Sequence, residues 1–185
     1  MSCSFTSTDI LKFDRAVPRY TSYPTAPHFS QGVGAKVFSD LLGNLTADEP
    51  VSIYIHIPFC RVRCTFCNFF QNAASRKLVD DYFEALLFEL KQKAKTPWAQ
   101  SGLFHAVYIG GGTPTDLSAM QVELLGKAIR EHFPLANDVE MTLEGRINRF
   151  SDEMFDRALE GGFNRFSFGI QSFNTKVRRS AKRLD

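Results

Sequence analysis

The feature that most constrains the fold is a regular alternation of strand-like and helix-like segments after residue 50. Runs rich in β-branched and aromatic residues predict four strands, at 51–57, 104–109, 139–143 and 165–170. Patterns with helical spacing lie between them, at 77–95, from Ser118 to about Phe133, and from Ser151 to the glycines at 161 and 162. Strands that alternate with helices imply right-handed crossovers and a parallel sheet. The sequence therefore predicts an α/β protein whose sheet is either doubly wound or curled into a barrel.

The apolar positions also predict which faces are buried. In the first strand, Ile53, Ile55 and Ile57 alternate with other residues and should share one face. In the first long helix the expected face consists of Leu78, Tyr82, Leu86 and Leu90. Ser118 with Gln121 predicts a capping box at the start of the second long helix.

We expect residues 1–50 to form a lead-in with a short helix at 35–45, and residues 51–185 to form the core. Prolines and glycines interrupt the first 34 residues, which show little periodicity. The sequence stops after a basic helical stretch at 175–183 without a domain-ending signal. We therefore expect a truncated core with an unpaired sheet edge, and no turnover from the 185-residue chain alone.

Composition excludes some classes of protein. A net charge of +2 is too small a basic excess to predict nucleic-acid binding. No apolar run approaches the roughly 18–20 residues of a membrane helix, and the N-terminus lacks the basic and apolar regions of a secretory signal. We expect a cytoplasmic protein with no membrane span and no nucleic-acid partner.

Three cysteines follow the first strand within eight positions: Cys60, Cys64 and Cys67. In a reducing compartment such a group is more typical of metal binding or catalysis than of disulfides. Four thiolates would saturate a cubane cluster or a structural zinc, whereas three leave one metal site open for an outside ligand. Cys3 is distant in sequence, although it could in principle be a fourth ligand. The alternatives are a structural zinc and a fortuitous group of cysteines.

This C-x3-C-x2-C spacing after a first strand resembles the signature of the radical S-adenosylmethionine (SAM) family. The resemblance implies a [4Fe-4S] cluster on Cys60, Cys64 and Cys67, whose unique iron binds the amino and carboxylate groups of SAM. An electron from flavodoxin or a similar reductant would then break the S–C5′ bond. Phe66 matches the aromatic position that lies against adenine. The implied fold is a radical SAM partial (β/α)6 TIM-type barrel, of which this chain covers the first four strands.

A glycine-rich loop, Gly110–Thr115 (GGGTPT), follows the second strand. Alone, it could be a tight turn or a phosphate loop, although the Gly-Lys-Ser/Thr of a P-loop is missing. In the radical SAM family the loop at this position binds the methionine part of SAM. The sequence of this loop resembles that of the branch that includes oxygen-independent coproporphyrinogen III oxidase. Three further segments also resemble this branch: PRYTSYPT at 18–25, YIHIPFC at 54–60 and GFNRFSFGIQSFN at 162–174.

Position by position, this resemblance implies seven SAM contacts: Tyr54, Gly111, Gly112, Thr113, Glu144, Gln171 and Arg183. Each has an ordinary alternative as a strand residue, a strand-end surface group or an exposed cation. Their shared placement at predicted strand ends favours a site.

Two departures from the coproporphyrinogen oxidases narrow the expected function. Phe69 stands where those enzymes have a fourth cysteine, and Gly145-Arg146 follows Glu144 where much of the branch has Asn-Pro or Asp-Pro. The combination looks most like the anaerobic heme-degradation radical SAM methyltransferases (ChuW/HutW type). That resemblance implies heme as the tetrapyrrole substrate, with methyl transfer, porphyrin ring opening and iron release. The alternatives are oxidative decarboxylation of coproporphyrinogen III and a non-catalytic heme chaperone.

Overall fold

The computed structural model describes residues 50–67 and 72–183, together with positions 34, 36, 37, 40 and 43. The helix predicted at 35–45 is covered only at Lys36, Val37, Asp40 and Gly43, and these four positions are helical. The rest of the predicted lead-in lies outside the described residues, and so do Cys3 and Phe69.

The core is a four-stranded parallel sheet of β1 (Val51–Ile57), β4 (Phe104–Gly111), β5 (Leu135–Gly145) and β6 (Arg165–Phe168). The strands lie side by side in the order in which they occur in the chain. A doubly wound sheet reverses its strand order at a switch point, and this sheet does not. The order decides between the two predicted architectures and confirms a partial TIM-type barrel.

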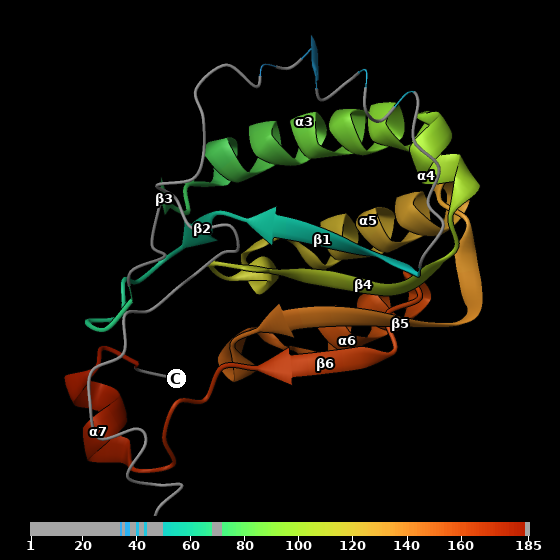
Figure 1. The fold of residues 1–185 in the computed structure, drawn as a ribbon. Helices are drawn as coiled ribbons and strands as arrows, with labels where there is room; N and C mark the ends of the chain where they lie inside the picture. Colours follow the sequence, from blue (N-terminus) through green and yellow to red (C-terminus); the bar gives the residue numbers. More distant parts are fainter. Residues whose placement is uncertain are drawn as a thin grey trace, which may run out of the picture. The chain divides into compact units, whose positions relative to one another are not determined.

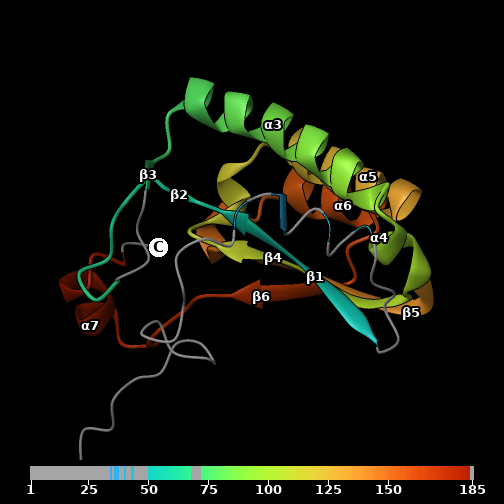
Figure 2. The same cartoon turned by 45° about the horizontal axis from the view of Figure 1, so that its top comes forward.

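Three helices cover one face of this sheet, α3 (Arg76–Ala94), α5 (Ala119–His132) and α6 (Asp152–Glu160), as Figures 1 and 2 show. Each begins after a serine whose hydroxyl accepts a backbone N–H three residues later: Ser75, Ser118 and Ser151. The capping box predicted for Ser118 and Gln121 is confirmed. Serine caps satisfy backbone donors that have no partner within the helix, which is why the starts were readable from sequence.

The remaining elements are short and most were not predicted. They are β2 (Phe59–Cys60) paired with β3 (Asn72–Ala73), α4 (Pro97–Ser101), the 3-10 helices η2 (Pro114–Asp116) and η3 (Ile147–Arg149), and α7 (Thr175–Ser180). The segment that contains β2 and helix α7 both lie at the end of the sheet toward which the strand arrows point (Figure 1). Strand β5 is longer than predicted at both ends, and β6 stops at Phe168 rather than at 170.

Apolar side chains from the sheet and the three helices form one core, which includes Ile55, Ile57, Val107, Ile109, Met141 and Leu143. The predicted burial of Ile55 and Ile57 is confirmed, and Ile53 packs against the core as a partly buried residue. The predicted face of α3 is wrong at Leu78, which is 44% exposed, whereas Val79 is 5% exposed. The helix carries two adjacent apolar stripes, and contact with the sheet selects the one that includes Val79.

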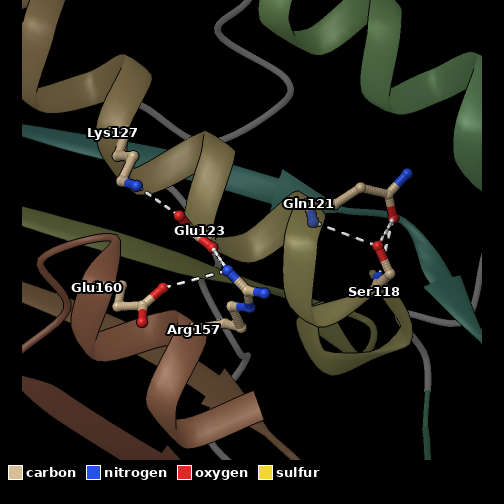
Figure 3. A network of polar contacts seen from close by, with 6 residues as sticks. All are labelled: Ser118, Gln121, Glu123, Lys127, Arg157 and Glu160. Carbon is tan, nitrogen blue, oxygen red and sulfur yellow. Dashed lines mark hydrogen bonds and ion pairs between the residues drawn. The ribbon is translucent and has the colours of Figure 1, made fainter. Parts of the chain in front are cut away.

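A polar network joins α5 to α6 (Figure 3). The buried Glu123 carboxylate accepts from Lys127 Nζ on its own helix and from Arg157 Nη1 on α6, at 2.7 Å for the latter. Arg157 Nη1 also lies 3.3 Å from Glu160 Oε2. The bonds from Lys127 and Arg157 hold the pKa of Glu123 below its usual value. This network fixes the two helices against each other and has a structural role.

We expect Gly126→Ala to destabilise the protein, because α5 and α6 are in backbone contact at this glycine. A Cβ at Gly126 would lie 2.3 Å from the carbonyl oxygen of Gly161. Overpacking of this kind typically costs about 1–3 kcal/mol of unfolding free energy. Urea denaturation measures it, with Gly43→Ala as the matched control, since a Cβ there meets nothing within 4 Å. Equal stability of the two variants would contradict the described helix contact.

Candidate functional site

A pocket lies at the carboxyl ends of the sheet strands. The parallel register places the loops that follow these strands next to one another at this edge of the sheet. Ile57 pairs with Gly111, and Gly145 pairs with Phe168. The pocket is lined by Cys60, Val62, Arg63, Cys64, Phe66, Cys67, Gly111, Gly112, Glu144, Gly145, Arg146, Gly169, Gln171 and Arg183. It therefore contains every residue predicted for the site except Tyr54 and Thr113.

The three cysteines lie on one loop and are free thiols. Cys60 and Cys64 are buried, and Cys67 is half-buried. The Cys67 N–H donates to the Cys64 carbonyl at 3.1 Å, and the Thr65 N–H donates to the Ala181 carbonyl, after α7, at 3.2 Å. The loop is thus turned on itself and is attached to the segment that carries Arg183.

Thr113 does not line this pocket but contacts one of the three cysteines. Its Oγ1 lies 3.4 Å from Cys60 Sγ, and the residue is 3% exposed. Burial raises the pKa of the Cys60 thiol, while the Thr113 hydrogen bond and the Arg146 charge act in the opposite direction. Thr113 therefore contacts Cys60 from the adjacent pocket that it lines with Asp116 and Arg146.

Two glycines at the end of β4 let the glycine-rich loop approach the cysteine loop. The Gly112 N–H donates to the Ile57 carbonyl at 2.8 Å. A Cβ on Gly112 would lie 2.4 Å from the Phe59 carbonyl oxygen and 3.0 Å from Cys60 Sγ. Gly111 has a φ of 118°, in the region that L side chains rarely adopt. A side chain is therefore excluded at Gly112 by close contacts and disfavoured at Gly111 by its backbone conformation. The glycine-rich sequence alone did not show these two reasons.

Two guanidinium groups converge on one cysteine. Arg146 Nη2 donates to Cys64 Sγ at 3.2 Å, and Arg183 Nη1 lies 3.6 Å from the same sulfur. Arg183 is 9% exposed and also donates to the Gly169 carbonyl. Sequence reasoning noted Arg146 only as a departure from related proteins and gave it no place in the site.

An acidic residue, Glu144, lines the same pocket as these cations. Tyr108 donates its hydroxyl to Glu144 Oε2 at 3.2 Å. Burial raises the pKa of Glu144, and the Tyr108 bond, Arg183 and His56 oppose that shift. Tyr54 does not line the pocket: it is 59% exposed, stacks on Tyr108 with ring centroids 6.1 Å apart, and bonds to His56 Nδ1 at 3.1 Å. Tyr54 thus reaches Glu144 through Tyr108.

The last two predicted residues are Phe66, which is notable for its exposure, and Gln171, which is notable for its backbone conformation. Phe66 is 52% exposed at the pocket rim, so its ring presents an apolar surface there. Gln171 has a φ of 69°, a left-handed conformation that is uncommon for a residue other than glycine. Such backbone strain occurs preferentially at ligand sites, where the surroundings hold it in place.

Comparison with known proteins assigns this fold and pocket to one class. The model of the radical SAM superfamily matches residues 54–184. The chain belongs to the radical SAM superfamily, as its sequence predicted. Enzymes of this superfamily use a [4Fe-4S] cluster and SAM, and these are the cofactors of this chain.

The similar proteins lie in one branch of the superfamily. The chain is 42% identical over 149 residues to the anaerobilin synthase of Escherichia coli O157:H7, covering 80% of this chain and 34% of that protein. It is 40% identical over 168 residues to the oxygen-independent coproporphyrinogen III oxidase of Paracoccus denitrificans, covering 90% and 37%. The solved structure of the Escherichia coli coproporphyrinogen III oxidase, a radical SAM enzyme, matches with a TM-score of 0.79 and 32% identity, over 96% of this chain and 39% of that one. The chain spans little more than a third of the length of these relatives.

The pocket residues fit the cofactors of the class. Three thiols border one cavity. An iron–sulfur cluster takes its thiolates at separate irons, and three thiolates leave one iron of a cubane cluster open for an outside ligand. Within the part of the chain that the structure describes, no helix is long and apolar enough to cross a membrane.

Gly112→Ala should weaken cluster binding, because the added Cβ would push the Phe59–Cys60 backbone away from β4. We expect less iron and sulfide per protein after anaerobic reconstitution and faster cluster loss to a chelator, with a loop-distortion cost of about 1–3 kcal/mol. Gly43→Ala again provides the control. Normal cluster content in Gly112→Ala would show that the glycine-rich loop does not set the position of the cysteine loop.

Proposed function

We propose that Cys60, Cys64 and Cys67 bind three irons of the [4Fe-4S] cluster and leave the fourth for SAM. The observation that carries this proposal is the group of three free thiols around one pocket whose other walls are a backbone cradle and charged side chains. When bound and reduced, the cluster supplies the electron that cleaves SAM. The protein's own residues bind SAM, orient it and exclude water.

The pocket offers complementary groups for each part of SAM. Gly111 and Gly112 let the backbone approach a ligand without interference from a Cβ. Glu144 provides a carboxylate for the ammonium of the methionine part, Arg183 provides a guanidinium for its carboxylate, and Phe66 provides an aromatic surface for adenine. In this proposal Gln171 completes the wall, while Thr113 and Tyr54 act behind it, through Cys60 and through the Tyr108–Glu144 pair.

The proposed substrate of the full-length natural protein is heme, with methyl transfer, ring opening to a linear tetrapyrrole and release of iron. Similarity to an anaerobilin synthase supports this substrate, as do Phe69 in place of a cysteine and the Glu144-Gly145-Arg146 sequence. The second candidate is the decarboxylation of coproporphyrinogen III, which the similarity to coproporphyrinogen oxidases favours. A third is a heme chaperone without turnover. Either reaction needs a low-potential electron donor, such as flavodoxin.

Cys64→Ala should abolish cluster assembly and SAM cleavage, because two ligands cannot hold the cubane in place of three. Anaerobic reconstitution followed by iron analysis, EPR spectroscopy with and without SAM, and detection of 5′-deoxyadenosine measure this loss. Cys3→Ala is the matched control and should retain the cluster. A Cys64→Ala variant with a full cluster and undiminished SAM cleavage would show the ligand assignment to be wrong.

Heme should be consumed by the reduced full-length protein with SAM, whereas coproporphyrinogen III should remain unchanged. Mass spectrometry of the products separates the three candidates, which yield a linear tetrapyrrole with free iron, protoporphyrinogen, or intact heme. The Cys64→Ala variant controls for non-enzymatic heme loss. Decarboxylated porphyrinogen alongside untouched heme would reject the heme-degradation proposal in favour of the second candidate.

A further inference from the structure

Arg146 is a cation held directly against a cysteine sulfur, and it has no role in the SAM contacts proposed above. Its Nη2 donates to Cys64 Sγ at 3.2 Å and to the Val62 carbonyl at 3.3 Å. The same guanidinium therefore contacts the backbone of the cysteine loop and one of its thiols. Its Nε is buried without a hydrogen-bond partner among the described residues, although the residue as a whole is only half-buried.

The backbone of Arg146 is fixed at the end of β5. Its N–H donates to Thr115 Oγ1 at 3.4 Å, and its carbonyl accepts the Arg149 N–H at 2.9 Å to begin η3. The preceding Gly145 makes this path possible, because a Cβ there would lie 2.4 Å from Thr115 Cγ2 and 2.6 Å from Phe150 Cε2. The turn aims the side chain at a residue 82 positions earlier in the chain.

The guanidinium of Arg146 donates to a sulfur and forms no ion pair with a carboxylate among the described residues. Asp116, which lines the adjacent pocket together with Arg146, is paired with Arg61, at 3.1 Å between Arg61 Nε and Asp116 Oδ1. Glu144 bonds to Tyr108. Among the described contacts of the Arg146 side chain, the two acceptors are therefore Cys64 Sγ and a carbonyl.

We propose that Arg146 sets the reduction potential of the cluster by donating a charged hydrogen bond to the ligand sulfur of Cys64. Reduction adds one negative charge that is shared with the ligand sulfurs, and a cation bonded to one of them stabilises the reduced form more than the oxidised form. Hydrogen bonds to sulfur and net charge are among the properties that set such potentials. Arg146 thereby makes the electron easier to deliver. This inference rests on the proposed ligand set and is independent of the identity of the tetrapyrrole.

Arg146 is a positioning and tuning residue, so its test measures a potential rather than turnover. The reconstituted protein is poised at a series of potentials without substrate, and the reduced cluster is quantified by EPR. We compare Arg146→Met, which removes the charge and the donors, with Arg146→Lys, which keeps the charge. Arg149→Met is the matched control. Like Arg146, Arg149 lines the adjacent pocket that contains Asp116, and its charge acts to lower the pKa of the buried Asp116 carboxyl.

We expect Arg146→Met to lower the ratio of reduced to oxidised cluster about tenfold at a fixed poise, which corresponds to about 59 mV for one electron. Arg146→Lys should recover most of that ratio, and Arg149→Met should match the wild type. Unchanged ratios in all variants would overturn the proposal, and an equal shift in Arg149→Met would replace it by a general effect of surface charge. If Arg146→Met does not retain a cluster, Arg146→Gln is compared with the wild type, and equal potentials again overturn the proposal. A wrong ligand set would appear separately, as an intact cluster in Cys64→Ala.

Discussion

The parallel register of the central sheet is the constraint on which the site depends. Strand β4 pairs with β1, β5 with β4 and β6 with β5, all in parallel, so the loops that follow the strands emerge along one edge. Residues far apart in sequence meet there: Arg183 lies beside Cys64 across 119 positions. No residue of the helices α3, α5 and α6 lines the pocket. The network around Glu123 joins α5 to α6 and has a structural role.

The pocket combines a locally determined part with a part that depends on the tertiary fold. The cysteines share one loop, whose turn is fixed by the Cys67–Cys64 backbone bond. Glu144, Arg146 and Arg183 arrive from β5 and from the segment after α7, and their placement needs the sheet and the later turns to be formed. The grouping of the three thiols is therefore local, whereas their exact placement and the electrostatic setting of the pocket depend on the assembled sheet.

Sequence patterns predicted the strands and the helix starts because each leaves a local signal, whereas most of the expected site residues were named from a family resemblance. Ser118 with Gln121 marks a helix start by satisfying backbone donors within one turn. The direction of Leu78 was predicted wrongly, since neighbouring apolar stripes on α3 are resolved only by contact with the sheet. Arg146 was visible as an unusual residue after Glu144, yet nothing in a linear sequence shows where a long side chain ends. The contact of Tyr54 with SAM stays a prediction, and the alternation of β1 could not show that its ring stacks on Tyr108.

The close approach of Gly112 to the Phe59–Cys60 backbone has a consequence for transplanting this site between proteins. The cysteine loop is shaped partly by the glycine-rich loop beneath it, through the bond from Gly112 to Ile57 and the space left by the missing Cβ. A graft of residues 58–67 onto another barrel would carry the thiols without the surface that holds them apart. The transferable unit is the pair of loops together with the two neighbouring strands, so an engineer or a recombination event must move β1 and β4 as one module.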